Sequence, residues 1–122
     1  MARTVLLVDD HDEFRAIART VLEADGFEVV AEAADGGAAV AECERARPDI
    51  VVLDVLLPDA NGFDIARALV ALGQRPIVVL ISTRDAGAYT MRLETTPARG
   101  FLSKRDFSGP ALRRIVEQER AS

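Results

Sequence analysis

The sequence has very little cysteine and no long apolar run. Cys43 is the only cysteine among the 122 residues, which excludes an internal disulfide and a cluster of thiolate metal ligands. No apolar run approaches the roughly 20 residues that a membrane-spanning helix needs. The amino terminus enters Val5–Val8 at once and then meets carboxylates, unlike a secretory signal peptide. These absences predict a cytoplasmic protein without a membrane partner.

Basic residues are also scarce relative to acidic ones. The chain has 15 lysines and arginines against 20 aspartates and glutamates, so its formal net charge is −5. This balance argues against nucleic acid as a direct partner, because a phosphate backbone requires a basic surface. Lys104 is the only lysine among the basic residues. A general preference for arginine explains the other basic positions but leaves this lysine to be accounted for.

Five apolar segments along the chain have the composition of strands. Two of them are apolar at every position, as expected for central strands of a parallel sheet, whereas the second has a polar side and suits a sheet edge. The five are Thr4–Val8, Phe27–Glu32, Ile50–Leu53, Ile77–Ile81 and Gly100–Leu102.

Helical patterns follow each of these strands. The first has apolar residues at helical spacing: Phe14, Ile17, Ala18, Val21 and Leu22. Others are predicted near 37–47, near 65–70, over Asp85–Thr96 with a poor apolar stripe, and after Ser108-Gly109-Pro110, where proline suits a first turn. Alternating strands and helices predict an α/β fold in which residues 1–122 form a single domain. The predicted domain is doubly wound: five strands form a parallel sheet, and five helices cover the two faces of that sheet.

Polar residues stand where four of the predicted strands end. Ligands of open α/β sheets bind at this carboxyl edge. An acidic pair there could simply cap a helix, and a lysine could lie on the surface. A carboxylate inside the apolar run 50–57 is harder to explain, because burying it unpaired costs several kcal/mol. The residues at these strand ends are Asp9, Asp10, Asp54, Ser82, Thr83 and Lys104.

Carboxylates gathered without a cysteine indicate a site for a hard cation, and Mg²⁺ fits because it prefers oxygen ligands and binds phosphate oxygens. The cation would also keep acids that repel one another ionised. We expect Asp10 and Asp54 to bind Mg²⁺ directly and Asp9 to bind it directly or through water. The backbone carbonyl of Leu56 is a further candidate ligand.

Three motifs resemble those of response-regulator receiver domains, in the same order and at the same spacing over essentially the whole chain. They are Val8-Asp9-Asp10, then Leu53-Asp54 with Pro58 and Gly62 behind it, and Gly100-Phe101-Leu102-Ser103-Lys104. The resemblance implies a flavodoxin-like strand order 2-1-3-4-5. It also implies that Asp54 is the phosphoacceptor beside Mg²⁺ and that Lys104 contacts the phosphoryl oxygens.

The same resemblance implies a switch. A sensor histidine kinase would phosphorylate Asp54, Ser82 would move towards the phosphoryl group, and Phe101 would be the switching aromatic residue. Such a chain is not an enzyme, although it promotes its own phosphorylation and dephosphorylation. The output face would comprise the fourth helix, Asp85–Thr96, the fifth strand and the last helix. An output domain, a target protein or a second copy of the chain would bind there.

Several alternatives remain open from the sequence. The family's hydroxyl position could fall on Ile81 instead of Ser82, with Thr83 in reserve. His11 could be a metal ligand or a phosphoryl relay, but its place favours a simple helix-start residue at the rim of the site. The whole chain could also be a receiver-like interaction module that works without phosphorylation. A phosphatase is disfavoured because Leu56 stands where its second acid would be, and a flavin carrier because the first phosphate loop is missing.

Overall fold

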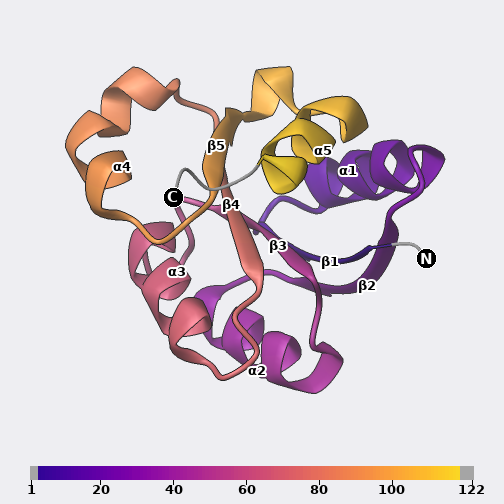
Figure 1. The fold of residues 1–122 in the computed structure, drawn as a ribbon, viewed down its shortest axis with the longest axis horizontal. Coiled ribbons are helices and arrows are strands. Elements are labelled where there is room, and N and C mark those ends of the chain that lie inside the picture. The colour runs from indigo at the N-terminus through magenta and orange to yellow at the C-terminus, as the bar shows by residue number, and fades with distance from the viewer. Residues whose placement is uncertain (1–2, 119–122) are drawn as a thin grey trace.

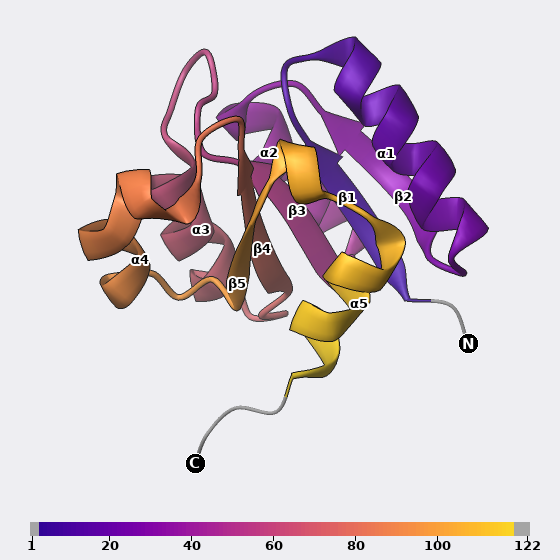
Figure 2. The same ribbon diagram turned by 90° about the horizontal axis from the view of Figure 1, so that it is seen from above.

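Residues 3–118, which the computed structural model describes, form a parallel five-stranded sheet with helices on both faces (Figure 1 and Figure 2). The strand order is β2-β1-β3-β4-β5. This confirms the predicted fold class and the flavodoxin-like order. The strands are β1 (Thr4–Val8), β2 (Glu28–Ala33), β3 (Ile50–Asp54), β4 (Ile77–Ser82) and β5 (Gly100–Ser103).

Helices α1 and α5 cover one face of the sheet, and α2 and α3 cover the other, while α4 lies beside the β5 edge (Figure 2). Their bounds are Asp12–Ala24 (α1), Gly36–Ala46 (α2), Gly62–Ala71 (α3), Thr90–Thr95 (α4) and Gly109–Glu117 (α5). Over residues 3–118, no helix combines the length and the hydrophobicity needed to cross a bilayer.

The central strands are buried on both faces because their side chains alternate between two hydrophobic clusters. Leu6 and Val51 pack towards α2 and α3, whereas Val5 and Val52 pack towards α1 and α5. The predicted stripe of α1 is wrong at Ile17, whose exposed fraction is 61%. Ile17 lies on the outer side of the helix, beyond the reach of the sheet.

The predicted helix Asp85–Thr96 is wrong as a single helix. The structure has a 3₁₀ turn at Ala86–Tyr89 and then the six-residue α4, and neither contains a buried residue. The segment has no continuous apolar stripe, so packing against the sheet does not stabilise a longer helix. The segment contacts the core only through partly buried side chains such as Tyr89 and Leu93.

Four strands, β2 to β5, end one residue later than predicted, and in β3 and β4 the added residue is a candidate site residue. Asp54, Ser82 and Ser103 are the last residues of β3, β4 and β5 instead of following them. Helices α2, α3 and α5 begin with side-chain caps, as when Asn61 accepts hydrogen bonds from the backbone of Phe63 and Asp64 at the start of α3, whereas α1 and α4 do not. The strand ends and the capped helix starts therefore have fixed backbone directions.

Glu32, on the edge strand β2, fastens α1 to the sheet. Its carboxylate accepts a hydrogen bond from Arg15 Nε and another from Arg19 Nε, both at 2.9 Å. Burial opposes the negative charge, but the two arginines outweigh it and hold the pKa of Glu32 below its usual value of 4.5. The carboxylate therefore stabilises the fold only while it is ionised.

The substitution Glu32→Gln is expected to lower the free energy of unfolding by about 1 kcal/mol at neutral pH. Because the pKa is lower in the folded state, this contribution is present above about pH 4.5 and is lost as the pH falls through the folded pKa. Urea unfolding of both proteins at a series of pH values measures it. A difference that does not shrink in acid would contradict the ionic origin. Glu42→Gln, which breaks a pair within α2 alone, is the control.

Candidate functional site

The carboxyl ends of the central strands and of β5 surround a cavity of about 240 Å³. Asp9 and Asp10 follow β1, Asp54 ends β3, Ser82 ends β4 and Lys104 follows β5. The cavity lining includes all of these except Asp9, which is buried beside it with an exposed fraction of 1%. The structure thus brings together the residues that the sequence predicted to meet.

Lys104 lies between two buried carboxylates. Its Nζ is 2.6 Å from Asp9 Oδ2 and 3.1 Å from Asp54 Oδ2, and also lies 4.8 Å from the centre of the Phe14 ring. Burial opposes the positive charge, but the two ion pairs outweigh it and raise the pKa of Lys104. A compact ammonium suits this position, because it can interact with two acids at once.

Asp54 is buried at the floor of the site, with an exposed fraction of 4%. Its Oδ1 accepts a hydrogen bond from the Leu56 backbone N–H at 3.1 Å. Burial raises the pKa of Asp54, and the charge of Asp9 acts in the same direction; the Leu56 N–H and Lys104 only partly offset them. The carboxylate is therefore held in a fixed orientation and lacks full compensation for its charge.

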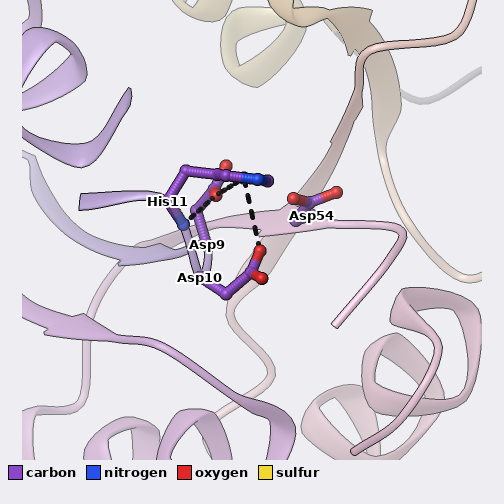
Figure 3. Close-up of side chains that lie close together, drawn as sticks. All are labelled: Asp9, Asp10, His11 and Asp54. Carbon is purple, nitrogen blue, oxygen red and sulfur yellow. Dashed lines mark hydrogen bonds and ion pairs between the residues drawn. The ribbon is translucent and has the colours of Figure 1, made fainter. Parts of the chain in front are cut away.

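Asp9, Asp10, His11 and Asp54 each offer a ligand atom, and these atoms all lie within 4.8 Å of one another (Figure 3). The charge of the buried Asp9 Oδ2 is met by Lys104 Nζ at 2.6 Å. The remaining carboxylate oxygens of the cluster are the ligand type that a hard divalent cation such as Mg²⁺ prefers.

His11 is in direct contact with the acids of the site. Its backbone N–H donates to Asp9 Oδ1 at 2.8 Å, and its Nδ1 is 3.0 Å from Asp9 Oδ1 and 3.3 Å from Asp10 Oδ1. The residue begins α1 as predicted, but without a side-chain capping bond, and its side chain is 65% exposed. It therefore stands at the rim, in contact with the acidic pair.

The loop after Asp54 is anchored to α2 by Asp59, a residue that the sequence reasoning missed. The Asp59 carboxylate accepts hydrogen bonds from the backbone N–H groups of Gly36 and Gly37, at 2.7 and 3.1 Å. These two bonds lower the pKa of Asp59. They hold the loop that presents Leu56, whose side chain is 59% exposed. The carbonyl of Leu56 as a metal ligand stays a prediction.

The structure separates the three candidates for the switch hydroxyl position. Ile81 is fully buried in the cluster beneath α1 and α5 and does not line the cavity, whereas Ser82 and Thr83 do. The Ser82 hydroxyl lies 3.0 Å from the hydroxyl of Tyr89. Tyr89, which the sequence reasoning also missed, packs its ring 5.9 Å from that of Phe101. Its being the only tyrosine was the one available signal.

A larger cavity, of about 530 Å³, lies at the opposite end of the strands. Its lining includes Arg3, Arg47, Arg75 and Arg99, but Asp49 is its single carboxylate. That carboxylate is already bonded to the backbone N–H and the hydroxyl of Thr4. The cavity has no nucleophile beside a cation site, so we assign the chemistry to the smaller one.

The fold and this edge define a class of protein: a doubly wound α/β domain with an acidic pocket, a buried aspartate and a lysine at the carboxyl ends of its strands. The model of the response regulator receiver domain family matches residues 5–117. The chain belongs to that family, whose members act as signalling switches in two-component systems. This confirms the resemblance read from the three motifs.

Curated relatives include longer regulators. The chain is 32% identical over 101 residues to the DNA-binding transcriptional activator EvgA of Escherichia coli, covering 83% of this chain and 50% of EvgA. It is 42% identical over 92 residues to a protein-glutamate methylesterase/protein-glutamine glutaminase of Anaeromyxobacter dehalogenans, covering 73% of this chain and 27% of that protein. The chain thus spans about half the length of EvgA and less of the methylesterase.

Solved structures show the same architecture. A LuxR-family two-component response regulator from an Aurantimonas species superposes with a TM-score of 0.84 at 29% identity, covering 96% of this chain and 84% of that one. The chemotaxis response regulator CheY4 of Vibrio cholerae gives a TM-score of 0.81 at 26% identity, covering 96% and 98%. These similarities extend over nearly the whole chain.

Proposed function

We propose that residues 1–122 form one receiver domain that is switched by phosphorylation of Asp54 by a sensor histidine kinase. The observation that carries the proposal is the position of Asp54: it is buried, oriented by the Leu56 N–H and paired with Lys104, and it lies beside Asp9 and Asp10. A second buried acid beside Asp54 does not serve stability, because the repulsion between the two carboxylates raises the free-energy cost of folding.

The transfer is a displacement at phosphorus. An Asp54 carboxylate oxygen forms the new O–P bond, the P–N bond of the kinase phosphohistidine breaks, and the electron pair stays on the imidazole nitrogen. Lys104 neutralises charge on the phosphoryl oxygens, which is the main requirement of such a reaction. Asp9, Asp10 and Asp54, with the Leu56 carbonyl, are the residues that would hold Mg²⁺, and a bound Mg²⁺ supplies further positive charge to the phosphoryl oxygens.

The product is a mixed anhydride that places new negative charge and acceptor oxygens at the end of β3. Ser82 and Phe101 would then reorganise and change the face formed by α4, β5 and α5. The weak anchoring of α4 supports this, since an element without buried residues moves at low cost. We propose that this face binds an output domain, a target protein or a second copy of the chain, and that the protein works in the cytoplasm.

Mass spectrometry tests the proposal. Intact protein incubated with Mg²⁺ and acetyl phosphate is expected to gain one phosphoryl group, whereas Asp54→Ala gains none. Asp64→Ala, which removes an exposed carboxylate on α3, is the matched control and retains the adduct. Absence of an adduct on the wild-type protein would favour the module that works without phosphorylation. An adduct that survives Asp54→Ala would place the acceptor elsewhere.

A further inference from the structure

The Ser82 hydroxyl already has two hydrogen-bond partners in the unphosphorylated protein. It is buried, with an exposed fraction of 1%, and accepts a hydrogen bond from the Arg84 backbone N–H at 3.1 Å. Its second neighbour is the Tyr89 hydroxyl at 3.0 Å. A serine hydroxyl has a single proton and two acceptor sites, and either hydroxyl can donate in the bond between Ser82 and Tyr89.

Tyr89 is itself held in place by aromatic rings. Its ring centre lies 5.6 Å from that of Phe63 on α3 and 5.9 Å from that of Phe101 on β5. The ring packs against the core beneath α2 and α3, while its hydroxyl faces the end of β4. Tyr89 therefore connects the site to the 3₁₀ turn that leads into α4.

We propose that Tyr89 is a positioning residue that holds Ser82 in the unphosphorylated arrangement and releases it when Asp54 is phosphorylated. This inference rests on the proposed function. Ser82 can donate its one proton to Tyr89 or to a phosphoryl oxygen, but not to both. If Tyr89 donates instead, the bond still fixes the serine rotamer. That rotamer must change when Ser82 turns towards the phosphoryl group, so the contact is lost in the switch whichever hydroxyl donates, and it stabilises the unphosphorylated arrangement.

The consequence is a defined effect on affinity for a phosphoryl mimic. Tyr89→Phe keeps the ring and its contacts but removes the bond to Ser82, so it destabilises only the unphosphorylated arrangement. With Mg²⁺ present, beryllium fluoride is expected to bind Tyr89→Phe about fivefold more tightly than the wild-type protein, as measured by isothermal titration calorimetry. Tyr89→Leu also removes the ring, so its unfolding in urea reports the packing contribution separately.

A double-mutant cycle with Ser82→Ala isolates the contact. In the Ser82→Ala background, Tyr89→Phe is expected to leave the affinity for beryllium fluoride unchanged. The wild-type protein supplies a second readout, because Tyr89 is its only tyrosine and it has no tryptophan. Addition of the mimic should change the tyrosine emission of the wild-type protein, and should not change that of Ser82→Ala.

Two results would overturn the inference, and they can be told apart. Equal affinity of the wild-type protein and Tyr89→Phe for beryllium fluoride would show that Tyr89 only packs, while leaving the proposed function intact. Failure of the wild-type protein to bind the mimic and to accept a phosphoryl group would remove the proposed function and this inference together.

Discussion

Gly62→Ala is expected to lower the free energy of unfolding by about 3 kcal/mol. A Cβ atom at this position would lie 2.4 Å from the backbone oxygen of Asp54 and 2.8 Å from the Cα of Val55. Both neighbours are backbone atoms of the β3 exit, so no side chain can turn away to relieve the overlap. The Gly62 N–H also donates to the Val55 carbonyl at 2.7 Å, which fixes α3 against that strand.

The same overlap reaches the site, because the displaced backbone carries the Asp54 side chain. We therefore expect Gly62→Ala to accept a phosphoryl group from acetyl phosphate more slowly, under conditions in which it is still folded. Gly73→Ala is the control, since a Cβ there has no neighbour within 4 Å. Urea unfolding of the two variants gives the comparison, and equal stability would show that the β3 exit yields to the added methyl group.

The gathering of the site residues could be predicted because it depends on the backbone alone. Parallel strands end at one edge of the sheet, so polar residues following apolar runs must meet there whatever their side chains do. Asp54 and Lys104 are of this kind: they are far apart in the sequence and 3.1 Å apart in the structure. The α/β fold class followed from the alternation of strands and helices, with errors of one residue at the strand ends and one helix predicted in place of two short segments, whereas the strand order followed from the resemblance to the family.

The interactions that the sequence did not predict depend on packing between loops. The contact of Tyr89 with Ser82 requires a 3₁₀ turn that points one ring between Phe63 and Phe101. The bonds of Asp59 require two glycine N–H groups that start a helix more than twenty residues earlier in the chain. No periodicity encodes either arrangement, because each is decided by how neighbouring elements sit against one another.

Lys104→Ala is expected to lower the free energy of unfolding by about 3 kcal/mol in the presence of a metal chelator. The side chains of Asp9 and Asp54 are only 1% and 5% exposed, and removing the ammonium leaves both carboxylates buried without their cation. Burial already raises the pKa of Asp54 with the lysine present. The loss of stability therefore reflects two like charges that water cannot screen.

The size of this loss should depend on Asp54 itself. Asp54→Asn alone is expected to leave stability unchanged or to increase it, because it removes the charge that burial and Asp9 disfavour. In the Asp54→Asn background, Lys104→Ala should cost less than it does in the wild-type protein. Urea unfolding of the four proteins in chelator gives this coupling directly. If the cost of Lys104→Ala is the same in both backgrounds, then the lysine contributes through its pair with Asp9 or its packing on Phe14 and not through Asp54.

Mg²⁺ supplies an independent check on the same electrostatic argument. A cation held by Asp9, Asp10 and Asp54 would offset their repulsion and stabilise the folded state in proportion to its binding. We therefore expect added Mg²⁺ to recover part of the stability lost in Lys104→Ala, and to recover less in the double variant, which has one carboxylate fewer. Equal gains in both would mean that the ion binds away from Asp54. The buried aspartate would then have no cation beside it other than Lys104, and the charge neutralisation required for phosphoryl transfer would be incomplete.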